Sequence, residues 1–167
     1  MAYSQTELDY LITCPKRITD PPRREMKMEE GYSRNDFRAE SMEGGHGFYV
    51  FLRRNERFPE NFSIGLDYDP PIGGRMALLR VNGPHGDYNR SFDPAHPHSD
   101  THVHWVNAED VELGIQKLRR AKAVKEYASF EEAVWYFLKL ARIPGDGEFF
   151  DHIGQMDLPF EDPETRK

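Results

Sequence analysis

Five short segments between residues 35 and 107 most constrain how this chain can fold. Each is rich in aliphatic, β-branched or aromatic residues and is bounded by turn-forming residues, which is typical of strands. The segments are Asn35–Glu43, Phe48–Arg54, Asn61–Tyr68, Arg75–Asn82 and Thr101–Asn107. Because most connections between them are short, we expect neighbouring segments to pair as an antiparallel meander.

Helical patterns flank this strand region. Ser4 opens a helix that Pro15 ends, and Ser129 opens one that runs to Ala141. Both serines are followed three residues later by glutamate, which is the pattern of a capping box. Residues 108–121 are also expected to be helical, with an apolar stripe on one side. The last helix has the widest apolar stripe, so it should cover one face of the sheet.

These patterns predict an α+β fold, with a single twisted antiparallel sheet of about five strands and flanking helices. We expect one domain over residues 1–156, followed by a charged, flexible tail over residues 157–167. Residues 16–31 are rich in charge and proline and are expected to be an extended connector.

Composition limits the classes of function. The chain of 167 residues has a net charge of -7, so no general attraction to nucleic acid or anionic membranes is expected. No segment resembles a leader peptide or a membrane span, and we expect a cytoplasmic protein. The single cysteine, Cys14, precedes a proline and is expected to be a buried structural thiol.

Five of the seven histidines lie in residues 85–104, around the last predicted strand. Side chains alternate between the faces of a strand, so His102 and His104 should share one face. Val103 and Trp105 should share the other face, and we expect Trp105 to be well buried in the core. The histidine face is therefore the candidate for chemistry.

Histidine pairs on strands suit two kinds of chemistry, and the sequence leaves both open. One is a metal site, in which His96 and His98 join His102 and His104 as ligands of a divalent ion. The other needs no cofactor and uses imidazoles as acid and base, because histidine titrates near neutral pH. A third interpretation is that the histidines are structural or incidental.

The metal-free interpretation fits cleavage of an RNA phosphodiester bond. One imidazole would deprotonate the 2′-hydroxyl, and another would protonate the leaving oxygen. A cation such as Arg80 would stabilise the charged transition state. Arg80 and Asn82 share one face of the strand that ends at Asn82. If this strand pairs with the last strand, both residues converge with His102 and His104 on one face, and His85 follows at the turn.

Two further residues are predicted to bind the substrate. Arg53 belongs to a local basic cluster that can contact phosphate, and His98 lies in the loop before the last strand. The alternative is that these arginines are solvated surface residues. Likewise, Asn82 and Gly83 alone are a strong turn signal that needs no functional explanation.

The segment from residue 78 to residue 106 resembles a loose set of uncharacterised bacterial and mobile-element proteins. In them, a strand that ends in an Asn-Gly or Asp-Asn turn is followed by a histidine and then by a His-x-His strand. The matching residues are Arg80, Asn82, Gly83, His85, His102 and His104. The segment Asn61–Leu66 resembles the preceding strand in these proteins.

Some of these proteins are described as toxin components of toxin–antitoxin pairs. The resemblance therefore implies a small ribonuclease-like protein that acts on RNA and has an inhibitor protein as a partner. It covers about a third of the chain, and the long insertion over residues 87–99 departs from the compact form of the motif.

A different class of function is a non-catalytic interaction module. A sheet face that binds another protein has to offer apolar or aromatic surface. Tyr49, Phe51 and Tyr68 are the residues expected to form such a surface.

Overall fold

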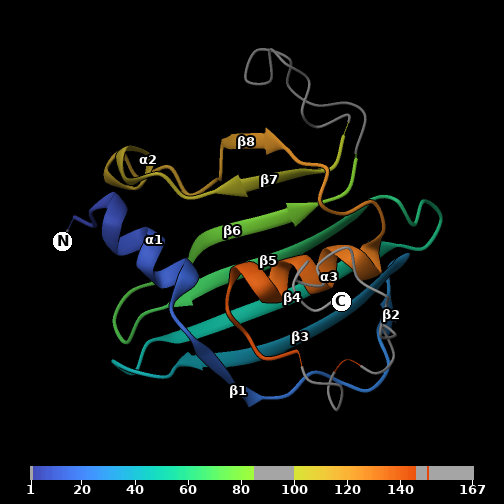
Figure 1. Ribbon diagram of the computed structural model, residues 1–167, viewed down its shortest axis with the longest axis horizontal. Helices are drawn as coiled ribbons and strands as arrows, with labels where there is room; N and C mark the ends of the chain where they lie inside the picture. Colours follow the sequence, from blue (N-terminus) through green and yellow to red (C-terminus); the bar gives the residue numbers. More distant parts are fainter. Residues whose placement is uncertain (1, 85–99, 146–149, 151–167) are drawn as a thin grey trace, which may run out of the picture.

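The structure is a computed structural model that describes residues 2–84, 100–145 and 150. Within them lie eight strands and three helices (Figure 1). The helices are α1 (Gln5–Thr13), α2 (Ala108–Glu112) and α3 (Phe130–Leu140). The strands are β1 (Lys16–Asp20), β2 (Lys27–Glu29), β3 (Tyr32–Ser41), β4 (Gly47–Asn55), β5 (Phe62–Asp69), β6 (Met76–Asn82), β7 (His102–Trp105) and β8 (Arg120–Ala123).

All eight strands belong to one sheet with the order β1-β3-β4-β5-β6-β7-β8, and β2 also pairs with β3. Every pairing is antiparallel. The predicted α+β class with an antiparallel sheet is confirmed, whereas five strands is an undercount. From β3 to β8, each strand pairs with the next one along the chain, as expected for a meander.

Alternating apolar residues build the covered face of the central strands. Phe37, Val50, Leu66 and Leu79 are neighbours across β3, β4, β5 and β6, and all four are buried. Burial of such side chains contributes about 1.5–3 kcal/mol each to folding. The period of two in these strands therefore sets which face receives the helices.

Both long helices pack on this face (Figure 1). α1 contacts β6, and α3 contacts β5 and β6. The capping box of α1 is present, since the Glu7 amide donates to Ser4 Oγ and the Ser4 amide donates to the Glu7 carboxylate. Ser129 caps α3 through the amide of Glu132. The predicted covering of one face by the last helix is confirmed, and α1 lies on the same face.

Three strands were missed by the sequence patterns. The expected connector over residues 16–31 contains β1 and β2, and residues 120–123 form β8, although residues 120 and 121 were expected to end a helix. β2 and β8 are short and mostly exposed, and β1 is largely so, so none shows the apolar alternation that marks a half-buried strand. α2 ends early because Gly114 adopts a φ of 74°, which reverses the chain.

Two other expectations concern single regions. Cys14 is buried, as predicted for a structural thiol. The tail over residues 157–167 lies outside the described residues, as does the end of the predicted domain. No helix among the residues described is long and apolar enough to cross a membrane.

A buried lysine joins the ends of the two long helices. The Lys16 side chain is only 2% exposed. Its ammonium donates to the carbonyl oxygens of Ile12 (2.7 Å) and Cys14 (2.9 Å) at the end of α1, and of Ala141 (2.8 Å) at the end of α3. It also lies 4.7 Å from the centroid of the Phe48 ring. Burial lowers the pKa of Lys16 from 10.5 to about 8.

Replacing this lysine tests its structural role. We expect Lys16→Met at pH 7 to lower the free energy of unfolding by about 2–3 kcal/mol, because three buried carbonyls lose a charged donor. Urea denaturation monitored by circular dichroism measures the loss. A loss below about 0.5 kcal/mol would show that water replaces the ammonium without cost.

The same pair of proteins gives a pH test. Between pH 8 and 10.5 the unfolded chain keeps a proton on Lys16 that the folded chain has released. Wild type should therefore gain stability relative to Lys16→Met as the pH rises through this window, and the gap should be constant below it. A gap that stays constant up to pH 10 would contradict the lowered pKa.

Candidate functional site

The predicted convergence of polar residues on one sheet face is present. β6 and β7 pair so that Arg80 lies opposite His104 and Asn82 lies opposite His102. All four side chains belong to the face without helices, because the alternate residues Val81 and Val103 lie in the core. The centroids of the two imidazole rings are 5.0 Å apart, with the rings nearly perpendicular.

A chain of hydrogen bonds fixes the orientation of His102. Ser63 Oγ donates to Asn82 Oδ1 at 2.7 Å, and Asn82 Nδ2 lies 3.4 Å from His102 Nε2. At the other end, His102 Nδ1 lies 2.8 Å from the carbonyl oxygen of Asp100. A carbonyl can only accept, so Nδ1 carries a proton. In the neutral ring, Nε2 is then the basic nitrogen that faces Asn82.

Tyr127 strengthens this end of the site. Its hydroxyl is 2.7 Å from the carbonyl oxygen of Asn82 and 2.9 Å from that of His102, so it ties β6 to β7. Burial raises the pKa of Tyr127 well above its usual range. The phenol is therefore a fixed hydrogen-bonding group at neutral pH.

The expected burial of this region is wrong, although the assignment of faces is right. His102 is 0% exposed and His104 is 6% exposed, whereas Trp105 is only half-buried. β7 is not the edge of the sheet, since Ala123 and Ala121 of β8 lie beside the two histidines. Trp105 lies instead at the floor of a cleft on the helix side.

Arg80 is engaged in contacts that hold the sheet together. Its guanidinium pairs with the Asp67 carboxylate at 2.7 Å and donates to the carbonyl oxygen of Leu79 at 2.8 Å. It also lies 4.6 Å from the centroid of the Phe51 ring. Burial lowers the pKa of Arg80, and the Asp67 carboxylate opposes this effect. Arg80 is thus better described as a structural cation than as a free phosphate ligand.

Arg53 has a different environment, next to Asn82. Both line a surface hollow of about 330 Å³ on the helix-free face, together with Tyr32, Asn61 and Ser63. Arg53 is exposed and lies 4.8 Å from the centroid of the Phe51 ring. Tyr32 is 41% exposed. The structure therefore brings Arg53 and Asn82 together in one hollow. His102 lies next to Asn82, on the neighbouring strand β7.

The predicted turn at Asn82-Gly83 is not formed. Gly83 continues beside β5, where its amide donates to the carbonyl oxygen of Phe62 at 3.0 Å. A Cβ at Gly83 would collide with the carbonyl oxygen of Glu60. Glycine is needed here for a close approach of two backbones rather than for a left-handed turn.

Several predicted site residues lie outside the described residues. These are His85, His96 and His98. Among the residues that are described, no group of three or more His, Cys, Asp or Glu side chains is placed to hold a metal ion. The metal site built from His96, His98, His102 and His104 thus stays a prediction.

Ser63 and Asp67 are site residues that sequence reasoning did not single out. Alternation already places them with Gly65 on the outer face of β5. Their partners depend on the register between β5 and β6, which the sequence does not reveal: Ser63 lies opposite Asn82, and Gly65 lies opposite Arg80. A bulge beside Leu66 and Asp67 shifts the register at this point.

Comparison of this chain with protein-family models, with curated proteins and with solved structures finds no match. The description of the site therefore rests on its own geometry.

Gly65 gives a direct test of how this face is packed. A methyl group there would collide with the Phe51 ring and lie 2.7 Å from Arg80 Nη1. We expect Gly65→Ala to lower the free energy of unfolding by about 1–3 kcal/mol, as for other overpacked sites. Gly74→Ala is the matched control, because a Cβ at Gly74 has nothing within 4 Å. Equal stability of the two variants would show that Phe51 and Arg80 move aside freely.

Proposed function

We propose that this protein is a small, metal-independent, ribonuclease-like enzyme whose substrate binds in the hollow beside Asn82. The observation that supports it best is the position of an exposed guanidinium, Arg53, in the same hollow as Asn82, with the imidazole of His102 beside Asn82 on the next strand. A cation for phosphate and a basic imidazole nitrogen thus lie within one short stretch of the helix-free face.

The hollow also offers groups that suit a nucleotide. Tyr32 has an exposed aromatic ring on which a base can stack, and Asn61 and Ser63 can form hydrogen bonds with a sugar or base. The 2′-hydroxyl distinguishes RNA from DNA for a protein that contacts it directly. A single-stranded segment suits the hollow better than a duplex, because stacking on a side chain needs an unpaired base.

The proposed reaction divides the proton transfers between two imidazoles. His102 Nε2 takes the proton of the 2′-hydroxyl, and the 2′-oxygen attacks phosphorus. The bond from phosphorus to the 5′-oxygen breaks, and that oxygen receives a proton from His104. The products are a 2′,3′-cyclic phosphate and a 5′-hydroxyl. Arg53 takes over the stabilisation of phosphate charge that the sequence assigned to Arg80, because Arg80 is held by Asp67.

Access to His102 is the restrictive step in this proposal. Since its ring is fully buried, a 2′-hydroxyl can reach Nε2 only when the Asn82 amide rotates out of its 3.4 Å contact. Asn82 is then a gate as well as a binding residue. A substrate that hydrogen-bonds to the amide would favour that rotation, so RNA contact and exposure of the base are coupled.

The interaction-module alternative retains part of its support. Tyr68 is buried beneath α1, where its ring meets Tyr3, but Tyr49 and Phe51 are only half-buried. Arginine side chains lie on both of these rings. The aromatic rings on the helix-free face are therefore partly covered by arginine guanidinium groups and do not form a bare apolar surface.

The nuclease proposal predicts cleavage of a labelled single-stranded RNA in the presence of EDTA. The rate should follow a bell-shaped pH profile, and a strand with deoxyribose at the cleaved position should be inert. His102→Ala should slow cleavage by about 10²–10⁴-fold, as for loss of a proton-transfer group. Gel electrophoresis and mass spectrometry of the product ends measure both results.

Arg53→Ala separates binding from unfolding, because Arg53 is exposed and loss of its contact with the Phe51 ring should lower the thermal midpoint only slightly. We expect this variant to reduce kcat/KM by at least about tenfold, through lost phosphate contact. Arg57→Ala is the matched control, since Arg57 is an exposed arginine that does not line the hollow. Equal rates for Arg53→Ala and wild type, or cleavage of the deoxyribose strand, would contradict the proposal.

A further inference from the structure

β8 is an open edge of the sheet. It pairs with β7 alone among the described residues, and its four residues are half-buried or exposed. The amide of Val124 donates to the carbonyl oxygen of Thr101, just before β7, at 2.9 Å. In an antiparallel pair, successive residues point their backbone groups to opposite sides. The amides and carbonyls of Ala121 and Ala123 therefore point away from β7, toward a strand position that no described residue occupies.

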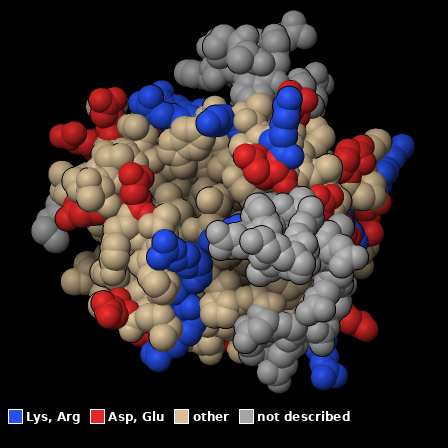
Figure 2. Space-filling model, viewed as in Figure 1, with Lys and Arg blue, Asp and Glu red and all other residues tan. Residues whose placement is uncertain are grey.

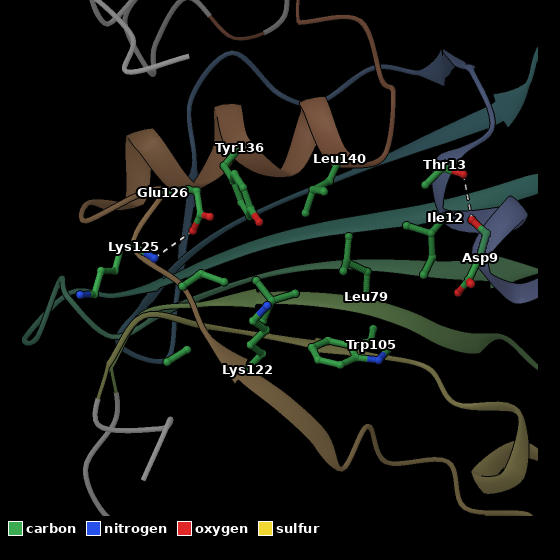
Figure 3. A pocket seen from close by; sticks show the side chains of 13 residues that line it. Asp9, Ile12, Thr13, Leu79, Trp105, Lys122, Lys125, Glu126, Tyr136 and Leu140 are labelled. Atoms are coloured by element: carbon green, nitrogen blue, oxygen red, sulfur yellow. Dashed lines mark hydrogen bonds between the residues drawn. The ribbon is translucent and has the colours of Figure 1, made fainter. Parts of the chain in front are cut away.

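This edge borders the largest cleft described, of about 770 Å³, which lies between α1 and α3 (Figure 3). Leu79 and Trp105 form its floor, and Tyr136 and Leu140 of α3 line one side. Val103 also lines the cleft. Its outer rim is β8 itself, through Lys122 and Ala123. A strand placed beyond β8 would add a further wall to this cleft.

The edge is also the most basic part of an acidic chain. Residues 117–125 contain five lysines and arginines and no acid, although the whole protein has a net charge of -7. Figure 2 shows Lys and Arg side chains above the cleft, over this end of the sheet. Arg119 and Arg120 pair with acids of α2, but Lys122 and Lys125 have no ion pair among the described residues.

From these three observations we propose that β8 docks an extended acidic segment of a partner protein as an added antiparallel or parallel strand. Backbone bonds to Ala121 and Ala123 hold the segment, as in other cases of strand addition. Acidic side chains on its helix-side face pair with Lys122, and aliphatic side chains on the same face turn toward the cleft.

The charge selects this occupant over a second copy of the chain. Two β8 strands placed edge to edge would bring Lys122 and Arg120 of both copies together, and like charges on neighbouring strands are destabilising. Lysines on an open edge prevent such self-pairing. An acidic strand removes that repulsion, so the same side chains that exclude a copy of the protein attract the proposed partner.

A synthetic eight-residue peptide with the repeat Glu-Thr-Leu-Thr is a suitable probe. Its glutamates and leucines share one face when it is extended, and threonine favours a strand. Titrated into the full ¹⁵N-labelled chain, it should shift the amide signals of Ala121 and Ala123 in a saturable manner. A peptide with the repeat Lys-Thr-Leu-Thr should not bind.

Matched variants separate strand addition from other modes of binding. Ala123→Pro removes one outward amide without removing a bond to β7, and should weaken binding by at least about tenfold. Ala123→Val keeps that amide and should bind like wild type. Lys122→Glu should also lose at least about tenfold in affinity through charge repulsion, without a change in the thermal midpoint.

Four results would overturn the proposal. The first is the absence of a saturable shift up to about 1 mM peptide, where even weak specific binding is detected. The second is equal affinity for the lysine peptide, and the third is equal affinity of Ala123→Pro and Ala123→Val for the glutamate peptide. The fourth is a set of shifts confined to Trp105 and its neighbours. The last would assign the cleft to a ligand that does not extend the sheet. None of these outcomes depends on whether the protein cleaves RNA.

Discussion

The ammonium of Lys16 determines how the two long helices share one face of the sheet. It donates hydrogen bonds to carbonyl oxygens at the C-terminal ends of both α1 and α3, those of Ile12, Cys14 and Ala141. The C-terminal end of a helix carries partial negative charge, which favours a cation there. The backbone of Lys16 also connects β1 to the segment after α3, since the Lys16 amide donates to the carbonyl oxygen of Arg142. One buried charge thus places both helix ends at the β1 edge, and the two helices diverge from there across the sheet (Figure 1). The space between them is the cleft that reaches β8.

The opposite face has no helix and is stabilised by a different set of contacts. Phe51 lies between Arg53 and Arg80, and Tyr49 lies between Arg38 and Arg75. Gly65 leaves room for Phe51 and Arg80 to approach each other, and Asp67 neutralises Arg80. These contacts determine which cations remain available for a ligand. Arg80 is part of the packing, whereas Arg53 has its guanidinium at the surface of the hollow beside Asn82. Arg53 is therefore proposed to bind the phosphate because its guanidinium is accessible, and not because it lies nearer to a histidine than Arg80 does.

Local patterns predicted much of the fold, and pairings that act over long distances limited the rest. Alternation identified β3 to β7, and the serine caps identified α1 and α3, because these signals lie within a few residues. The charged edge strands β1, β2 and β8 have no such signal, since most of their side chains stay in solvent. The convergence of Arg80, Asn82, His102 and His104 followed from assuming one correct strand pairing. The position of β8 beside both histidines could not follow, because residues 120 and 121 were expected to end a helix and β8 has no apolar alternation.

β8 also connects the two proposals physically. Its side chains alternate in the opposite sense to those of a core strand. The charged residues Arg120 and Lys122 lie on the helix side, and the small residues Ala121 and Ala123 lie on the side of the histidines. Small side chains allow β8 to lie close beside His104 and His102 while contributing little apolar burial of their own. The strand is therefore held mainly by its pairing with β7, which makes it one of the less stable parts of the sheet. An added strand would provide β8 with a second row of backbone bonds. It would thereby stabilise the strand that lies beside His102 and His104, so a partner on this edge would act on the site from one strand away.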